Sequence, residues 1–358
     1  MKNKEITVLV TCVASQVMPN IIKHIKSYKD REIKIIGIDQ KPKDLSIGSY
    51  FCDTFYQSPA GSNSKYISFI ENIVNKHNIS IIFPCSDEEV ISLSSIRSKL
   101  LNTYRCVLIS SENKETLLAS NKFEMLNHIK KNGIPTPKYY SVDNIESLKQ
   151  VVKVLGYPKN KVILKPKEGR GSKGLKIISS NISEYDRFIS TGNFFISFEE
   201  VLNFFSKHKK ALLDFIIMEY LPGDKYSSDI LVENNKIKSI VTRNNWKTPK
   251  TSPPTQMADI VFDKDVIEYC EKICSVTDFN FFIQIETGRD KDGKIMYIET
   301  NPRLDATLPI TLGLDINYYH EMITKSINGK YNKNLLKSKN GKNQIRFFRY
   351  WNETFNEV

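Results

Sequence analysis

The chain has 358 residues, 40% of them hydrophobic and 26% charged, so it can bury a sizeable core and is long enough for two or three structural units. Its net charge of +12 is spread along the chain among acidic residues, without an aromatic RNA-binding motif or zinc-finger spacing, so we expect no nucleic-acid partner. No stretch approaches the roughly 18 apolar residues that span a bilayer, so we expect a cytoplasmic protein without membrane contact.

The first third of the chain alternates short apolar runs with helical patterns. We expect strands at 6–10, 33–38, 79–84 and 107–110, and helices at 19–28 and 66–77. Strands separated by helices of this length predict a parallel α/β sheet. The turn after the first strand lacks the three glycines of a dinucleotide fingerprint, so we do not expect this sheet to bind NAD in the usual way.

The pattern changes after residue 120. We expect a helix at 122–131, strands at 161–165 and 174–178, a helix at 198–207, a strand at 215–219, and a hairpin from 227 to about 243. A helix at 263–276 then precedes a last hairpin, with strands at 281–286 and 295–299. The Asp-Gly step at 292–293 favours a tight turn between these two strands.

A glycine-rich basic loop joins the strands at 161–165 and 174–178. Within 165–174 it has three glycines, a serine hydroxyl and four cationic side chains. Glycines let backbone amides approach an anion, and the cations suit the oxygens of a polyphosphate. A Walker A loop differs, because it runs from a strand into a helix. Taken alone, the loop is equally consistent with a lysine-rich surface hairpin.

The last hairpin predicts a metal site, because side chains two apart on a strand point to the same face. Gln284 and Glu286 share one face of their strand, and Glu299 and Asn301 share one face of theirs. Mg²⁺ binds a few hard oxygen ligands, usually alongside substrate phosphates. Arg303 follows this cluster in an Asn-Pro-Arg step, where a guanidinium can stabilise charge that develops during phosphoryl transfer.

In this order, the motifs resemble the ATP-grasp superfamily, especially its carbamoyl-phosphate-synthase-like and amino-acid ligase branches. The motifs are Asn121-Lys122, 133–137, 165–174, 218–223, Gln284 and 299–303. The segment 83–89 is similar to a stretch of the domain that precedes the ATP-grasp domain in this family. The resemblance therefore covers nearly the whole chain.

The resemblance implies an α/β fold in which an N-terminal parallel-sheet pre-ATP-grasp domain precedes a two-lobed α+β ATP-grasp domain. We expect the first domain at 1–114 and the ATP-grasp domain at 115–330. Within the latter, a lid subdomain would cover about 120–220 and a metal-binding lobe about 221–330. The remaining 331–358 would be a C-terminal extension.

The resemblance also assigns roles to individual positions. The ATP-binding residues would be Lys122, Lys165, Gly171, Ser172, Glu219, Tyr220, Leu221 and Asp224. The metal ligands would be Gln284, Glu299 and Asn301, with Glu286 as a weaker candidate, and the catalytic residues would be Arg303 and Arg243. One position departs from the family, because Lys225 stands where a glutamate often holds the ribose hydroxyls, and Asp224 would have to replace it.

The implied activity is an ADP-forming, carbon-nitrogen bond-forming ligase that joins a carboxylate and an amine through an acyl phosphate. ATP and Mg²⁺, with two ions and Mn²⁺ as a substitute, are the expected cofactors. The partners would be small-molecule carboxylates and amines, amino acids among them, and a homodimer is one option. Alternatives are carbamoyl-phosphate-type or kinase-like phosphoryl transfer, and a nucleotide-binding regulatory protein without ligase activity. We expect specificity to lie in 244–256, 304–307 and 87–89.

Overall fold

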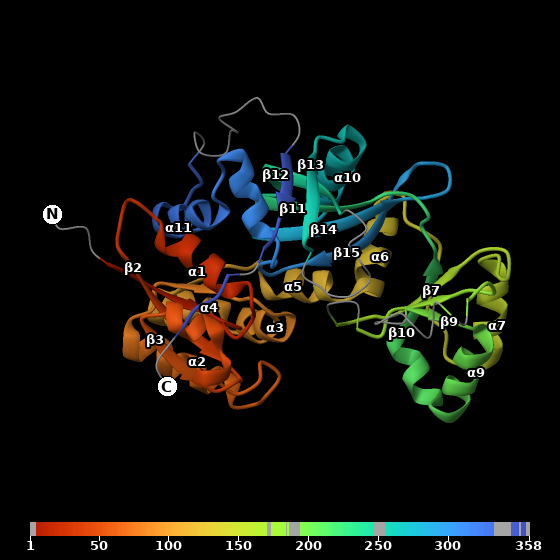
Figure 1. The fold of residues 1–358 in the computed structure, drawn as a ribbon, viewed down its shortest axis with the longest axis horizontal. Helices are drawn as coiled ribbons and strands as arrows, with labels where there is room; N and C mark the ends of the chain where they lie inside the picture. Colours follow the sequence, from red (N-terminus) through yellow and green to blue (C-terminus); the bar gives the residue numbers. More distant parts are fainter. Residues whose placement is uncertain are drawn as a thin grey trace.

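The computed structural model describes residues 5–169, 173–183, 185, 194–245, 255–332, 345–350 and 352–355. Three β-sheets follow one another along the long axis of the molecule, and helices cover them (Figure 1). We call them sheets A, B and C in the order of their first strands. Within the described ranges, no helix is both long enough and apolar enough to cross a bilayer.

Sheet A is the predicted parallel α/β unit. Its strands are β1 (Ile6–Val10), β2 (Ile33–Asp39), β3 (Thr54–Gln57), β4 (Ile81–Phe83) and β5 (Val107–Leu108), in the order β3-β2-β1-β4-β5 and all parallel. The connections contain η1 (Lys43–Leu45), η2 (Ile47–Phe51), α1 (Met18–Lys26), α2 (Tyr66–His77), α3 (Asp87–Ser95) and α4 (Arg97–Tyr104). The buried residues of α1 repeat at helical spacing, so one face of this helix packs on the core.

Sheet B contains β6 (Tyr139–Tyr140), β7 (Val162–Pro166), β8 (Lys176–Ile178), β9 (Phe195–Ile196) and β10 (Phe215–Glu219), in the order β6-β10-β7-β8-β9. Its hydrophobic core includes residues of α7 (Ile145–Val154), α9 (Phe198–Lys207) and η3 (Lys209–Asp214). A capping box formed by Ser197 and Glu200 fixes the start of α9. β7 and β8 pair antiparallel, which confirms the strand-loop-strand arrangement predicted around the basic loop.

Sheet C is antiparallel, with the order β15-β14-β11-β12-β13-β16. Its strands are β11 (Lys225–Glu233), β12 (Lys236–Asn245), β13 (Met257–Val261), β14 (Phe281–Arg289), β15 (Ile295–Asn301) and β16 (Ile345–Phe348). Strands β11 and β12 meet in a turn where Asn234 and Asn235 both have positive φ, as a two-residue hairpin turn requires. β16 lies in the segment expected as a C-terminal extension and forms an edge strand of this sheet by pairing with β13.

The helices around sheet C divide its side chains between two clusters. Ile283 and Ile285 pack in a cluster with residues of α6 (Lys122–Lys131) and α10 (Lys264–Ser275). Phe282 instead joins a cluster with β1, α1, η4 (Leu308–Leu314) and α11 (Tyr318–Asn328). A short helix, α5 (Asn113–Ser120), leads from sheet A into α6. Because successive residues of a strand alternate faces, Gln284 and Glu286 lie on the same face as Phe282.

Candidate active site

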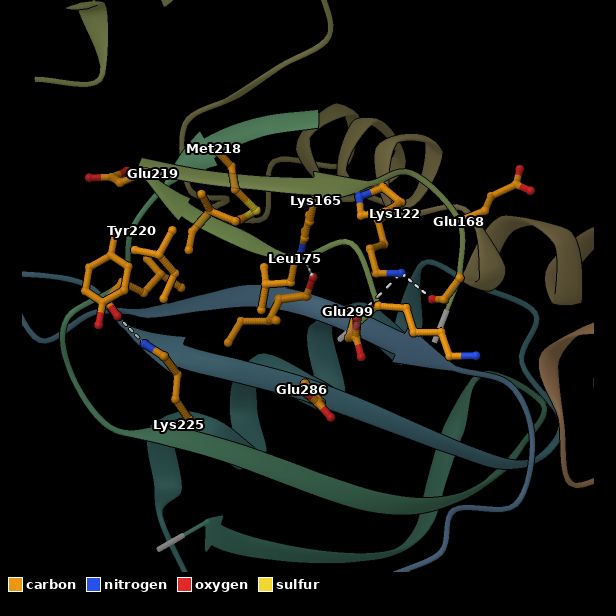
Figure 2. Close-up of a pocket in the computed structure, with 17 residues that line it drawn as sticks. Lys122, Lys165, Glu168, Leu175, Met218, Glu219, Tyr220, Lys225, Glu286 and Glu299 are labelled. Carbon is orange, nitrogen blue, oxygen red and sulfur yellow. Dashed lines mark hydrogen bonds and ion pairs between the residues drawn. The ribbon is translucent and has the colours of Figure 1, made fainter. Parts of the chain in front are cut away.

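A cleft of about 290 Å³ lies between sheets B and C. Strands β7, β8 and β10 of sheet B form one wall, and β11, β14 and β15 of sheet C form the other (Figure 2). Both sheets therefore contribute residues to the cleft. Its lining residues include Lys122, Lys165, Glu219, Tyr220, Leu221, Glu286 and Glu299 from the predicted site.

Two lysines enter the cleft from the side of sheet B and α6 (Figure 2). Lys165, on β7, is 6% exposed, and its Nζ donates a hydrogen bond to the Ile298 carbonyl oxygen over 2.8 Å. Burial lowers the pKa of Lys165 to about 8. The Nζ of Lys122 donates to the Gly169 carbonyl oxygen over 2.8 Å and lies 3.6 Å from an oxygen of Glu299. Two ammonium groups thus stand at one end of the cleft, as binding of a polyphosphate would require.

Two glutamates face these lysines from sheet C. Glu286 on β14 and Glu299 on β15 are register partners, so their side chains are adjacent on one face. Burial raises the pKa of Glu286 above its usual range, and the neighbouring charge of Glu299 raises it further. A cation held between the two carboxylates would relieve this repulsion. The pair is therefore a suitable place for a divalent ion.

Gln284 and Asn301 form the next register pair along the same face. Asn301 Nδ2 donates to Gln284 Oε1 over 3.1 Å, and Gln284 Nε2 donates to Asp229 Oδ1 over 3.0 Å. Gln284 is 1% exposed and does not line the cleft. Its amide is committed to neighbouring side chains, whereas Glu286 faces the open space.

The two predicted catalytic arginines lie beyond this pair, in a buried network of acids. Arg243 on β12 is 2% exposed, and it contacts Asp229 over 2.5 Å and Asp305 over 3.4 Å. Arg303 contacts Asp305 over 3.3 Å and, through Nε, Asp87 of α3 over 3.0 Å. The ion pair with Asp87 ties the segment after β15 to the unit built on sheet A. Both arginines thus belong to one network next to Asn301.

The other end of the cleft is formed where β10 ends. Met218, Glu219, Tyr220 and Leu221 line it, and Lys225 completes it from β11 (Figure 2). Lys225 Nζ donates to the carbonyl oxygens of Leu221 and, over 3.2 Å, of Gly223. Burial lowers the pKa of Lys225 to about 8.

The chain between β10 and β11 depends on a glycine. Gly223 lies so close to Arg289 that an added Cβ would be 2.7 Å from the Arg289 Cβ. Asp224, the predicted substitute for the ribose-binding glutamate, is exposed and does not line the cleft. Of the neighbouring positions 224 and 225, the structure places the lysine in the cleft.

Two predicted ATP-binding residues, Gly171 and Ser172, lie outside the described residues. Among the residues that are described, no three His, Cys, Asp or Glu side chains gather as a metal cluster. The oxygen set at this end of the cleft is thus two carboxylates, Glu286 and Glu299, with the amide of Asn301 nearby. This small set fits Mg²⁺, which usually completes its octahedron with waters and substrate phosphates.

The sequence analysis did not single out Asp229 of the buried network or Arg349 beside it. Asp229 lies within the apolar strand β11 and is fully buried. The periodicity of the strand alone does not show that this acidic side chain is buried. Arg349 follows β16, and its Nη2 donates to the Ala306 carbonyl oxygen over 2.6 Å. The only sequence signal for Arg349 is its place in an aromatic run, 347–351. Asp305 and Asp87 fall in segments where we expected specificity.

Two protein-family models match the chain. Residues 211–345 match a model described as "ATP-grasp in the biosynthetic pathway with Ter operon". Residues 8–105 match a model described as the PylC-like N-terminal domain. A search of curated proteins gave no match.

Solved structures share the fold at low sequence identity. N5-carboxyaminoimidazole synthetase from Staphylococcus aureus, complexed with ADP, is 14% identical with a TM-score of 0.67, and the match covers 93% of this chain and 80% of that one. The biotin carboxylase domain of 2-oxoglutarate carboxylase from Hydrogenobacter thermophilus is 16% identical with a TM-score of 0.68, covering 93% and 72%. L-amino acid ligase from Bacillus licheniformis is 10% identical with a TM-score of 0.64, covering 94% and 78%.

The family matches fall on the two parts of the chain that the motifs had indicated. The N-terminal match covers most of sheet A, and the second match covers β11 to β15 of sheet C with the paired carboxylates. The structural similarities extend the same fold across sheet B. Residues 211–345 are thus similar to the ATP-grasp family and residues 8–105 to the PylC-like N-terminal domain, and the solved structures show a shared fold.

Proposed function

We propose that the protein is an ATP-dependent carboxylate-amine ligase that works through an acyl phosphate and releases ADP and phosphate. One observation carries the proposal: Lys122 and Lys165 face Glu286 and Glu299 across a cleft between two sheets. Cations for phosphate oxygens and carboxylates for a metal ion thus meet at one end of a single cavity. The other end offers an apolar slot with backbone polar groups, as a purine base would need.

In this arrangement ATP lies along the cleft. The base would occupy the end formed by Met218, Tyr220 and Leu221, where backbone groups can read its edge. The phosphates would lie between Lys122 and Lys165. Tyr220 stands between two cations, since its ring lies 5.4 Å from Lys161 Nζ and 5.7 Å from Lys225 Nζ. Lys225 therefore adds a cation at the end of the cleft where the base would lie.

Glu286, Glu299 and Asn301 would hold the magnesium ions, and Gln284 would position Asn301 through their hydrogen bond. This assignment gives Glu286 a larger role than the sequence did, because Glu286 lies directly opposite Glu299 and lines the cleft. When bound, Mg²⁺ neutralises phosphate charge and orients the chain of phosphates.

The reaction would follow in two steps. A carboxylate oxygen attacks the γ-phosphorus of ATP, the bond to the bridging oxygen breaks, and ADP leaves. The amine nitrogen then attacks the acyl carbon, phosphate leaves, and the nitrogen loses a proton. Arg303 would stabilise the transferred phosphoryl group, with Asp87 and Asp305 fixing the direction of its guanidinium. Arg243 would support this geometry through Asp305.

Similar proteins support the choice of nucleotide and metal. The S. aureus synthetase is complexed with ADP, and the H. thermophilus domain is complexed with MgADP, ADP and bicarbonate. The B. licheniformis protein is named an L-amino acid ligase. These names include different small molecules on one fold, which is why the assay uses a range of carboxylates and amines.

An ADP-release assay tests the proposal. Purified protein is incubated with ATP, Mg²⁺ and pairs of carboxylates and amines, with the amino acids tested first. We expect ADP release that requires both substrates and is lost in Glu299→Ala. Glu268→Ala is the matched control, because Glu268 is an exposed carboxylate on α10 outside the cleft.

The outcomes separate the proposal from its alternatives. ADP release that needs a carboxylate but no amine, with a stable phosphorylated product, would favour kinase-like or carbamoyl-phosphate-type transfer. Nucleotide binding without ADP release for any pair would favour a regulatory nucleotide-binding protein. Equal activity of Glu299→Ala and Glu268→Ala would contradict the assignment of Glu299 as a metal ligand.

A further inference from the structure

A lysine is held in a defined position at one end of the cleft between sheets B and C. Lys225 is the first residue of β11, and its register partner on β14 is Gly288. A Cβ added at Gly288 would be 3.0 Å from Lys225 Cδ and 3.2 Å from Lys225 Nζ, so the glycine leaves room for the lysine to lie against the sheet. Nζ donates hydrogen bonds to the carbonyl oxygens of Leu221 and Gly223. The ammonium group is therefore fixed in the wall of the cleft.

Lys225 shares a face of sheet C with the proposed metal ligand Glu286. Glu286 and Gly288 are two positions apart on β14, and Lys225 lies opposite Gly288. Two positions along a strand correspond to roughly 7 Å, so one nucleotide can extend past both side chains. Figure 2 shows Leu175 between the end that holds Lys225 and the end that holds Glu299. Because the sugar of a nucleotide joins the base to the phosphates, the sugar of ATP in this cleft would lie beside Lys225.

A carboxylate is a common acceptor for the hydroxyls of a ribose. Among the described residues, none points into the cleft beside Lys225. Glu219 lines the cleft, but its Oε2 accepts a hydrogen bond from the Lys138 backbone nitrogen over 3.2 Å, and Figure 2 shows its side chain turned away from Lys225. Asp224 is exposed and does not line the cleft. The other carboxylates of the lining lie toward the phosphate end: Glu168, Glu286 and Glu299.

A lysine and a carboxylate respond differently when a sugar hydroxyl is missing. A carboxylate that reads the hydroxyl is left with an unpaired charge, so such a site rejects the analogue without the hydroxyl. An ammonium has three N–H donors, and two carbonyl oxygens already accept from Lys225. The third donor can turn to water or to another oxygen of the nucleotide. The nearby side chains of Ile163, Leu175 and Ile177 are apolar and offer the hydroxyl no partner.

We propose that the nucleotide site does not select for the 2′-hydroxyl, so that the protein uses 2′-deoxy-ATP nearly as well as ATP, and that Lys225 sets this specificity. The inference rests on the proposed ligase function and widens the class of its co-substrate to adenosine and 2′-deoxyadenosine triphosphates. The transfer itself is the same with either sugar, because the bond that breaks lies between the γ-phosphorus and its bridging oxygen.

Isothermal titration of the full chain in the presence of Mg²⁺ tests the proposal without turnover. The probes are ADP and 2′-deoxy-ADP. We expect their dissociation constants to agree within about fivefold, because Lys225 loses no obligatory partner with the 2′-hydroxyl. In turnover, the KM values for ATP and 2′-deoxy-ATP should agree within about the same factor, with little change in kcat.

Lys225→Glu places an acceptor beside the sugar and should raise the preference for ADP over 2′-deoxy-ADP at least about tenfold above that of the wild type. Lys225→Gln supplies an uncharged acceptor that can still donate to the Leu221 carbonyl oxygen, and should raise the preference at least about threefold. Lys161→Gln is the matched control and should keep the wild-type ratio. Lys161 Nζ lies 5.4 Å from the centre of the Tyr220 ring, close to the 5.7 Å of Lys225, but Lys161 is exposed and does not line the cleft.

Two results would overturn the inference while the ligase function stands: a wild-type preference for ADP above about fivefold, or a ratio that neither Lys225 variant changes relative to Lys161→Gln. Absence of binding by both nucleotides would overturn the inference together with the nucleotide site. Failure of the ligase function alone is a separate result. In that case the two nucleotides bind alike, but no pair of substrates releases ADP.

Discussion

Replacement of Arg243 by methionine tests whether the buried ionic network holds sheet C together. Methionine keeps an unbranched side chain of similar reach but removes the guanidinium. The carboxylate of Asp229, which is fully buried, would keep the hydrogen bond from Gln284 as its one side-chain contact among the described residues. Asp305 would keep its contact with Arg303. Removing one partner of a buried pair costs about 3–5 kcal/mol, so we expect the free energy of unfolding to fall by about that amount at pH 8.

The pH dependence of this loss follows from Asp229. Burial raises the pKa of Asp229 from 3.8 to about 6, even with Arg243 present. A carboxyl with a raised pKa in the folded state contributes most stability below its unfolded pKa, and this contribution is lost as the pH rises through the folded pKa. Without Arg243 the folded pKa is higher still. The loss should therefore be smaller at pH 5, where Asp229 takes up a proton, than at pH 8.

Urea unfolding at both pH values measures these differences, with the double variant Arg243→Met, Asp229→Asn as the matched control. Asparagine removes the unpaired charge, so the double variant should recover at least about half of the loss at pH 8. A loss below about 1 kcal/mol in the single variant, or no recovery in the double variant, would refute this reasoning.

Three further predictions concern single side chains. Glu321 is 1% exposed, and burial raises its pKa to about 7, so its charge destabilises the fold as the pH rises toward 7. Glu321→Gln should therefore raise the free energy of unfolding at pH 8 by roughly 1–2 kcal/mol, a figure that allows for solvent screening. At pH 4.5 the same variant should change little. Gly223→Ala should lower the free energy of unfolding by about 1–3 kcal/mol in thermal unfolding, because its Cβ would clash with Arg289. Glu286→Ala should raise the Mg²⁺ concentration for half-maximal ADP release about tenfold, and Gln284→Ala should raise it less. Equal effects of the two variants would contradict the assignment of Glu286 as a ligand and Gln284 as a positioning residue.

Local patterns predicted much of the fold. The helices at 122–131, 66–77 and 198–207 and the strand at 215–219 have the predicted bounds. These elements carry strong local signals: apolar residues at helical spacing, an N-cap side chain such as that of Asn121, or a short apolar run before a turn. The alternation of side chains on the last hairpin follows equally from local geometry, and the register of β14 with β15 agrees with it.

These local patterns could not show whether Gln284 or Glu286 lies opposite Glu299. Both residues are on the same face, because they are two positions apart, so alternation cannot distinguish them. The register decides which one lies opposite Glu299, and an irregularity between Glu286 and Thr287 shifts that register. The position of a bulge depends on the pairing of the whole hairpin. The sequence therefore predicted which side chains share a face but not which of them lies opposite Glu299.

Contacts between distant segments were harder still to predict. Asp229 pairs with Arg243 because β11 and β12 are neighbours, and with Gln284 because β14 lies on the other side of β11. Arg349 reaches Ala306 only because β16 pairs with β13. The periodicity of one strand contains no information about its neighbours in the sheet, so these partners could not be read from local sequence.

The segment 301–306 follows the proposed metal ligands and carries Arg303. An acyl phosphate formed beside Arg303 would be exposed to hydrolysis if water had free access to it. The buried network of Arg243, Asp229 and Asp305 fills the space behind this segment with paired charges, which excludes bulk water while keeping the arginines fixed. In this view the network has a kinetic role in addition to its effect on stability. Arg243→Met, if it folds at pH 6, should then release ADP in excess of amide product, whereas the wild-type protein should release the two in equal amounts.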